Sequence, residues 1–228
     1  MLSVVPPFVP GAVVFDLDGV LVDSEGLWAQ VEQRVALDLG ASWEPAVQEA
    51  MLGRGPAEAA QVLARHAGHP DPIEVQARLL AAALEVFAGN VRARTGAPEL
   101  VVALAAQLPV AVATNSRREL AEVSLAAAGL REVLSALVTA DDVPAAKPDP
   151  APYLEACRAV GVAPERALAF EDSPVGARSA RAAGCWVIGC PMTVHPDLDA
   201  AHVVVADLAD LDPDVLVAGH DTPARVAR

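Results

Sequence analysis

The stretch that begins at Ala12 constrains the fold and the chemistry of this chain more than any other. Its first four residues, Ala12–Phe15, are all apolar, as is typical of a strand buried on both faces of a parallel sheet. Asp16 and Asp18 follow, with Gly19 permitting a sharp turn behind them. Two carboxylates this close repel each other, and a divalent cation would relieve the repulsion. Asp and Gly are also common in ordinary turns, so the rest of the chain must decide between the two interpretations.

Strand-like and helix-like segments alternate through most of the 228 residues, a pattern that indicates an α/β fold. We predict a doubly wound, Rossmann-like parallel sheet with helices on both faces. The predicted strands lie at residues 12–15, 110–113, 136–138, 167–170, 186–189 and 203–205. The predicted helices between them lie at residues 98–107, 118–128, 151–160 and 175–183.

One long block interrupts this alternation, because no strand-like run occurs between residues 24 and 91. Ser24 is of the type that caps helix N-termini, and apolar residues follow it at helical spacing until Gly40. Further helices are predicted at residues 44–51, 56–66 and 72–87. An all-helical block placed directly after a buried strand indicates an inserted cap. We therefore predict a catalytic core of residues 1–23 and 93–228 and a helical cap domain of residues 24–92.

Composition excludes several classes of function. A formal net charge of −14 argues against a nucleic-acid-binding protein, because affinity for nucleic acid depends on clustered Lys and Arg. No apolar run approaches the roughly 18 residues of a membrane helix, and the N-terminus does not resemble a signal peptide. The three cysteines are interpreted as buried, reduced thiols. We expect a soluble cytoplasmic protein, a monomer or weak homodimer, that binds neither nucleic acid nor membranes.

Polar side chains follow four of the predicted strands, at the edge where parallel α/β sheets bind ligands. They are Asp16 and Asp18, Thr114 and Asn115, Glu171 and Asp172, and Lys147, the only lysine in the chain. The carboxylates would hold Mg²⁺, while Lys147 and the groups around Thr114 would bind phosphoryl oxygens. One carboxylate can attack phosphorus, and a second can protonate the leaving oxygen. The set predicts a Mg²⁺-dependent phosphoryl-transfer site.

Four short motifs contain these residues: Asp16-Leu17-Asp18-Gly19-Val20, Ala113-Thr114-Asn115-Ser116, Lys147-Pro148-Asp149-Pro150 and Phe170-Glu171-Asp172-Ser173. Together they resemble the motifs of the haloacid dehalogenase superfamily, subfamily I, in the branch that contains β-phosphoglucomutase and many sugar phosphatases. They occur in the family's order and lie within residues 12–184. The acid at Asp18 argues against the dehalogenases of this superfamily, and the lack of a cap lysine argues against its phosphonatases.

The resemblance implies roles for individual residues. Asp16 would be the nucleophile that forms an aspartyl phosphate, and Asp18 would be the general acid and base. Lys147 and Thr114 would bind the phosphate. The implied metal ligands are Asp16, Asp18 through its backbone carbonyl, Glu171 directly or through water, and Asp172.

The other predicted substrate contacts are Asn115, Ser116 and Arg117 in the core and Glu25, Trp28 and Arg54 in the cap. Three of these have a structural alternative: Trp28 also fits a core residue, Glu25 a first-turn acid favoured by the helix dipole, and Arg117 a solvated arginine. We predict a Mg²⁺-dependent phosphatase of small phosphorylated metabolites, sugar phosphates foremost.

A phosphosugar mutase similar to β-phosphoglucomutase is the second hypothesis. That enzyme has a histidine where this chain has Trp28 and a phosphate-binding arginine near the position of Pro56, and both are missing here. Arg54 would replace that arginine only if the loop at residues 53–55 turned differently. A third hypothesis is a catalytically silent protein that binds phosphorylated metabolites, and the intact Asp16 and Asp18 argue against it.

Overall fold

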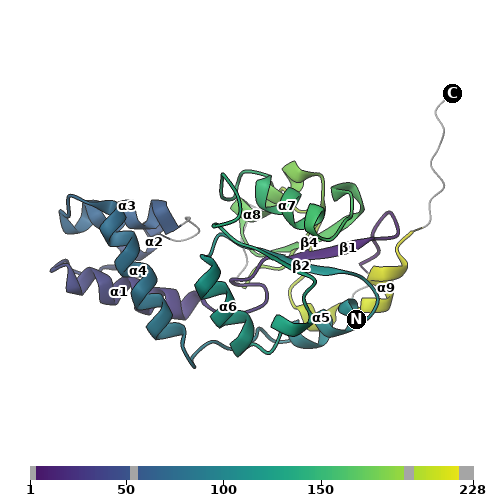
Figure 1. Cartoon of the computed structure of the whole chain (residues 1–228), viewed down its shortest axis with the longest axis horizontal. Helices are drawn as coiled ribbons and strands as arrows, with labels where there is room; N and C mark the ends of the chain where they lie inside the picture. Colours follow the sequence, from purple (N-terminus) through teal and green to yellow (C-terminus); the bar gives the residue numbers. More distant parts are fainter. Residues whose placement is uncertain (1–3, 52–55, 193–197, 221–228) are drawn as a thin grey trace.

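The computed structural model describes residues 4–51, 56–192 and 198–220. Within these residues, a six-stranded sheet forms the centre of the molecule, in the order β3-β2-β1-β4-β5-β6 (Figure 1). The strands are β1 (Ala12–Phe15), β2 (Val110–Ala113), β3 (Ala136–Val138), β4 (Ala167–Glu171), β5 (Trp186–Gly189) and β6 (Val203–Val204). Every pair of neighbouring strands is parallel. The predicted doubly wound α/β fold is confirmed.

Helices cover both faces of the sheet. Successive side chains along a strand point to opposite faces, so the all-apolar strands make both faces apolar. Val13 and Phe15 belong to one core cluster and Val14 to the other. The covering helices are α5 (Ala97–Ala105), α6 (Arg118–Ala127) and α9 (Pro213–Ala218) on the first face and α7 (Ala151–Ala159) and α8 (Pro174–Ala183) on the second. Figure 1 shows α7 and α8 above the sheet and the other three below it. Burial of each large apolar side chain contributes about 1.5–3 kcal/mol to this packing.

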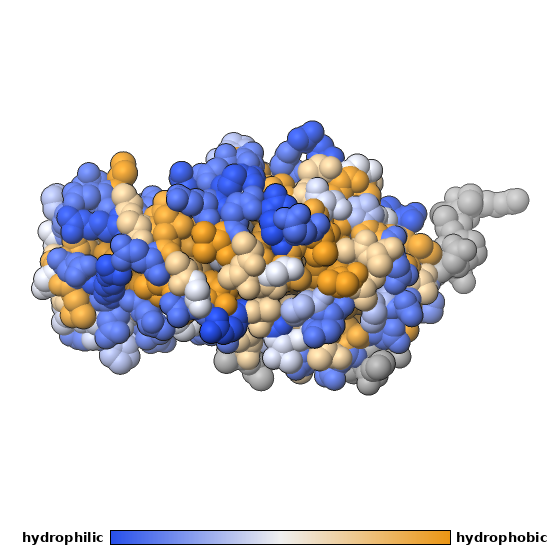
Figure 2. All heavy atoms as spheres, turned by 60° about the horizontal axis from the view of Figure 1, so that its bottom comes forward, coloured by the Kyte–Doolittle hydropathy of each residue, from blue (hydrophilic) through white to orange (hydrophobic). Residues whose placement is uncertain are grey.

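Four helices lie between β1 and β2: α1 (Glu25–Asp38), α2 (Pro45–Met51), α3 (Pro56–Ala67) and α4 (Pro72–Phe87). Helix α4 packs against α1 and α3 and also contacts α6. Figure 1 shows the four helices extending from one end of the sheet, and Figure 2 shows hydrophilic residues prominent at that end of the face it draws. The predicted helical insertion is confirmed. The limits of the two domains, set at residues 24 and 92, stay a prediction.

The two connections between the sheet and this insertion lie side by side. Val22 forms an antiparallel bridge with Ala93, and the Asp23 N–H donates to the Arg92 carbonyl at 3.0 Å. Both ends of the insertion are therefore fixed beside the turn that follows β1. The helical cap is held over the carboxyl edge of the sheet as a result.

Helix α9 is absent from the sequence prediction, as are the short 3-10 turns η1 (Arg131–Val133), η2 (Pro164–Arg166) and η3 (Leu208–Asp210). Asp212 caps α9 by accepting hydrogen bonds from the N–H groups of Asp214 and Val215. Asp followed by Pro is a helix-start signal, but six residues are too few to show a helical period. Among the described residues, no helix has the length and apolar character needed to cross a membrane.

Candidate active site

The turn after β1 places two aspartates at the carboxyl edge of the sheet. Asp16 is buried, and its N–H continues the sheet by donating to the Phe170 carbonyl at 2.9 Å. The chain then turns at Gly19, which has φ of +79°. A Cβ atom on Gly19 would lie 2.0 Å from Asp172 Oδ2, so the position requires glycine for space as well as for backbone conformation. The same turn brings Asp18 back toward the sheet edge.

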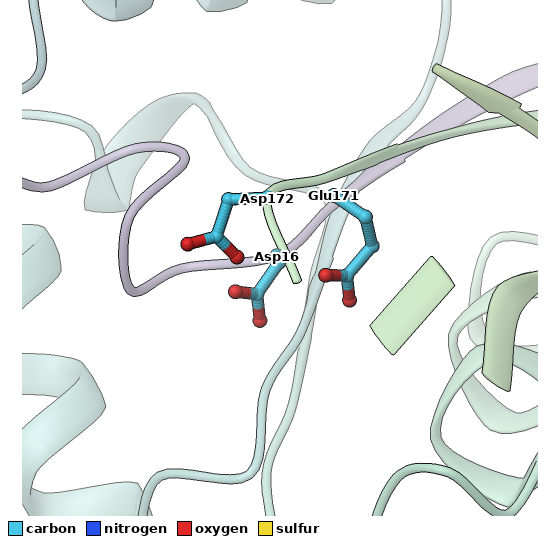
Figure 3. A group of neighbouring side chains, drawn as sticks. All are labelled: Asp16, Glu171 and Asp172. Atoms are coloured by element: carbon cyan, nitrogen blue, oxygen red, sulfur yellow. The ribbon is translucent and has the colours of Figure 1, made fainter. Parts of the chain in front are cut away.

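Asp16, Glu171 and Asp172 form a carboxylate cluster at the ends of the neighbouring strands β1 and β4 (Figure 3). One oxygen from each lies within 4.8 Å of the others. Burial raises the pKa of Asp16 to about 7, in part opposed by Lys147 and reinforced by the charges of Glu171 and Asp18. Burial, followed by the Asp16 and Glu171 charges, raises the pKa of Asp172 well above its ordinary value. The three carboxylates therefore repel one another strongly.

Lys147 is the counter-ion of this cluster. Its Nζ lies 2.6 Å from Asp16 Oδ1 and 2.6 Å from Glu171 Oε1. The Tyr153 hydroxyl donates to the same Glu171 oxygen at 2.7 Å, and the Tyr153 ring centroid lies 5.0 Å from Nζ. Burial lowers the pKa of Lys147, but the charges of Asp16 and Glu171 outweigh it, and the net shift is upward. The ammonium therefore stays charged and fixed in place.

The donor set of this cluster fits a hard divalent cation. Three carboxylates facing one lysine leave excess negative charge, and their oxygens are the ligands that Mg²⁺ prefers. The predicted ligands Asp16, Glu171 and Asp172 are thus brought together. Asp18, predicted to contribute only its backbone carbonyl, has no side-chain oxygen in the cluster.

The Asp18 side chain is held by three donors from different parts of the chain. Oδ1 accepts from Ser24 Oγ at 2.7 Å and from Trp28 Nε1 at 3.3 Å, and Oδ2 accepts from Ser116 Oγ at 2.7 Å. Ser24 precedes α1 as predicted, but its side chain does not cap the helix. Its hydroxyl instead donates to the Asp18 carboxylate in a charge-assisted hydrogen bond. Asp18 is thereby held apart from the carboxylate cluster.

The segment after β2 surrounds the cluster from the other side. The buried Thr114 accepts a hydrogen bond at Oγ1 from the Ser116 N–H at 3.0 Å, which stabilises the turn. Arg117 lines the same cavity as Thr114, and its Nε lies 2.8 Å from Asp141 Oδ1. The roles predicted for Thr114, Ser116 and Arg117 in binding substrate remain predictions.

Asn115 holds the backbone of Lys147. Its Oδ1 accepts from the Lys147 N–H at 2.9 Å, and its Nδ2 donates to the Lys147 carbonyl at 3.3 Å. The predicted role of Asn115 was a substrate contact. In the structure its amide binds both the N–H and the carbonyl of Lys147, so it fixes where the Lys147 side chain begins.

A cavity of about 630 Å³ lies between the sheet edge and the helical cap. The predicted core residues other than Glu171 line its base, and the predicted cap residues Glu25 and Trp28 line its other side. Arg54, also predicted to bind substrate, lies outside the described residues. Glu32, Gln48 and Gln76 line the cavity too and are absent from the sequence prediction. Glu25, Trp28 and Glu32 recur at helical spacing along α1, which is the signal that could have found Glu32.

Arg94 is a second position that sequence reasoning missed. It is buried, and its guanidinium donates to the carbonyls of Gly19, Cys190 and Pro191. These contacts join the turn after β1 to the segment after β5. The sequence alone does not single out this residue, because nothing in the local sequence distinguishes a buried arginine from a solvated one.

Comparison with known proteins places this geometry in a family. Residues 10–184 match the family model described as haloacid dehalogenase-like hydrolase. Validoxylamine A 7'-phosphate phosphatase of Streptomyces hygroscopicus subsp. limoneus is 36% identical over 202 residues, covering 87% of this chain and 94% of the relative. A phosphorylated carbohydrates phosphatase of Thermotoga maritima is 30% identical over 175 residues, covering 76% and 81%.

A solved structure agrees with these matches. The crystal structure of a mutant of CbbY from Rhodobacter sphaeroides in complex with xylulose-(1,5)bisphosphate has a TM-score of 0.79 and 28% identity, covering 89% of this chain and 96% of that chain. The sheet order and the helical insertion after β1 belong to the same fold. With a family match over most of its length and these relatives, the chain belongs to the haloacid dehalogenase-like hydrolases, among which it is a phosphatase.

Proposed function

We propose that this phosphatase hydrolyses phosphate monoesters of small metabolites, sugar phosphates foremost, through an aspartyl phosphate formed on Asp16. One observation carries the proposal: the Asp16 carboxylate faces the cavity between Lys147 and Asp172, while Asp18 is held separately by its own three donors. Two carboxylates in different environments suit two different roles, one as nucleophile and one as proton carrier.

The relatives support sugar phosphates as the substrate class. Two curated relatives are named as phosphatases of validoxylamine A 7'-phosphate and of phosphorylated carbohydrates. The related CbbY structure contains xylulose bisphosphate. A cavity of about 630 Å³ is in the range of small-molecule sites and would accommodate a phosphorylated monosaccharide.

We propose that Asp16, Glu171 and Asp172 hold Mg²⁺, with the Asp18 backbone carbonyl as a further ligand. When bound, the ion would supply positive charge that reduces the repulsion between a carboxylate nucleophile and an anionic phosphate. Lys147 adds a fixed positive charge on the Asp16 side of the cavity. The Thr114 hydroxyl and the nearby backbone N–H groups would bind the remaining phosphoryl oxygens.

In the first step an Asp16 oxygen attacks phosphorus, the bond from phosphorus to the ester oxygen breaks, and Asp18 gives its proton to the leaving oxygen. In the second step a water oxygen attacks the phosphorus of the aspartyl phosphate. Asp18 takes the proton of that water, and Asp16 is released together with inorganic phosphate. A serine hydroxyl can donate or accept a hydrogen bond, so Ser24 and Ser116 can hold Asp18 in both protonation states.

The test is phosphate release from a panel of sugar phosphates, polyol phosphates, phosphoglycolate and nucleotides, with and without Mg²⁺, by the wild type and Asp16→Asn. We expect release that needs both the metal and Asp16. Interconversion of phosphosugar isomers with little free phosphate would support the mutase alternative instead. Binding of an ester with neither reaction would support a silent binding protein.

A further inference from the structure

The cap side of the cavity carries acidic and neutral groups only, among the described residues that line it. Helix α1 contributes Glu25, Trp28 and Glu32, and α2 and α4 contribute Gln48 and Gln76. The remaining lining residues of α1–α4 are apolar. The polar groups that the described residues place at the end of the cavity away from the carboxylate cluster are therefore neutral or negative.

Glu32 lies one helical turn beyond Trp28 on α1, about 6 Å farther along the helix axis. Trp28 contacts Asp18, and α1 runs away from the sheet toward the far end of the cap (Figure 1). Glu32 thus faces the part of the cavity that would hold the end of a substrate remote from the reacting phosphate. It is partly buried and has no hydrogen-bond or ion-pair partner among the described residues.

The Glu32 side chain is partly withdrawn from water, and none of the described residues supplies it with a compensating charge. Burial raises its pKa to about 7. A carboxyl group that is withdrawn from water without a partner gains most from a ligand that donates hydrogen bonds to it. Hydroxyl groups are such donors, whereas a phosphate group offers acceptors and negative charge.

The cationic side chains that line the cavity within the described residues both come from the core and both are already paired. Lys147 bridges Asp16 and Glu171, and Arg117 is paired with Asp141. Neither is on the cap side with Glu32. Among the described residues at that end of the cavity, a second phosphate would meet a carboxylate rather than a cation.

We propose that Glu32 is a specificity residue that selects substrates with one phosphate and a hydroxyl-rich far end over the corresponding bisphosphates. Its carboxyl accepts hydrogen bonds from hydroxyl groups of the substrate and repels a second phosphate. This inference rests on the proposed phosphatase function. It separates the chain from the related CbbY, whose structure holds a bisphosphate.

The test compares kcat/KM at pH 8.5, where Glu32 is ionised, for two matched pairs, fructose 6-phosphate with fructose 1,6-bisphosphate and glucose 6-phosphate with glucose 1,6-bisphosphate. The wild type should prefer the monophosphate of each pair. Glu32→Gln, which removes the charge and keeps the shape, should shift the ratio toward the bisphosphate by about tenfold, mainly through KM. Glu32→Lys should shift it further in the same direction.

Glu58→Gln is the matched control, because Glu58 is an exposed cap carboxylate that does not line the cavity. It should leave both ratios unchanged. The inference is overturned if the wild type prefers bisphosphates, or if Glu32→Gln and Glu32→Lys leave the ratios at the wild-type values, or if Glu58→Gln shifts them equally. If the wild type releases phosphate from no ester at all, the proposed function itself fails, and the two failures are thereby distinguished.

Discussion

Trp28 Nε1 donates a hydrogen bond to Asp18 Oδ1 at 3.3 Å, and this contact joins the first helix of the cap to the turn after β1. The Trp28 ring also packs edge-on against Phe87 at the end of α4, with the centroids 5.3 Å apart. The tryptophan therefore links the proposed proton carrier to two cap helices. Trp28 packs within the cap and also lines the cavity, so the two interpretations of this residue are compatible, and its contact with substrate stays a prediction.

Trp28→Phe should lower kcat by about three- to tenfold, because Asp18 loses one of its three donors while the apolar packing is largely kept. Steady-state kinetics on the best sugar phosphate would measure this. Trp186→Phe is the control, since Trp186 stacks on His202 and does not line the cavity. If Trp28→Phe and the wild type had equal kcat, the hydrogen bond from Trp28 would not contribute to the proton transfer proposed for Asp18.

Asp18→Asn should separate the two chemical steps. With p-nitrophenyl phosphate the leaving group needs no proton, so Asp16 can still be phosphorylated. Hydrolysis of the aspartyl phosphate should then be slowed by about 10²- to 10⁴-fold, because the base that activates water is missing. We expect a burst of about one equivalent of p-nitrophenolate in stopped-flow measurements. A variant that turned over sugar phosphates at the wild-type rate would exclude Asp18 as the acid and base.

Lys147→Ala should abolish activity and destabilise the fold by about 3–5 kcal/mol, because it leaves Asp16 and the buried Glu171 without their counter-ion. Chemical denaturation followed by circular dichroism would give the loss in the free energy of unfolding. The exposed Arg65 on α3 offers a control, and Arg65→Ala should leave stability and activity almost unchanged. A Lys147→Ala protein as stable as the wild type would contradict the role of Lys147 as the buried counter-ion.

Tyr153→Phe should weaken Mg²⁺ binding by roughly tenfold, because the hydroxyl that orients the Glu171 carboxylate is lost while the ring is kept. Titration calorimetry with Mg²⁺ measures this without any substrate. Glu171→Gln serves as the comparison and should weaken binding more, since it changes a proposed ligand directly. Unchanged Mg²⁺ affinity in Tyr153→Phe would mean that Glu171 is positioned without the tyrosine or does not bind the metal.

Ionisation of Glu32 should lower the free energy of unfolding as pH rises. Burial raises its pKa in the folded protein from 4.5 to about 7. The stabilisation from binding this proton is fully present below pH 4.5 and is lost as pH rises through 7. Between pH 5 and pH 8, Glu32→Gln should gain about 1–2 kcal/mol of stability over the wild type, after allowance for the partial exposure of the side chain.

Urea denaturation of both proteins at the two pH values would test this. The same comparison with Glu58→Gln should show no such gain. A constant difference in unfolding free energy between Glu32→Gln and the wild type would show that Glu32 titrates as it does in the unfolded chain.

The sequence by itself determined the secondary structure of the core and the insertion, apart from α9 and the short 3-10 turns. Apolar runs such as Ala12–Phe15 and the helical period of residues 72–87 are local signals, and the structure confirms both elements at those limits. The convergence of Asp16 with Asp172 was also predictable, because the carboxyl ends of parallel strands share one edge.

The tertiary structure alone decided which partners the polar side chains take. Ser24 is of the residue type that caps helices, yet its side chain donates to Asp18. The Asn115 amide binds the backbone of Lys147, and the buried Arg94 guanidinium donates to three carbonyls. Nothing in the local sequence distinguishes Glu32 from an acid on the surface of a helix. It lines the cavity only because the cap folds over the sheet. The physical reason is that strand and helix preferences come from neighbours in the chain, whereas burial and hydrogen-bond partners come from segments that are distant in sequence.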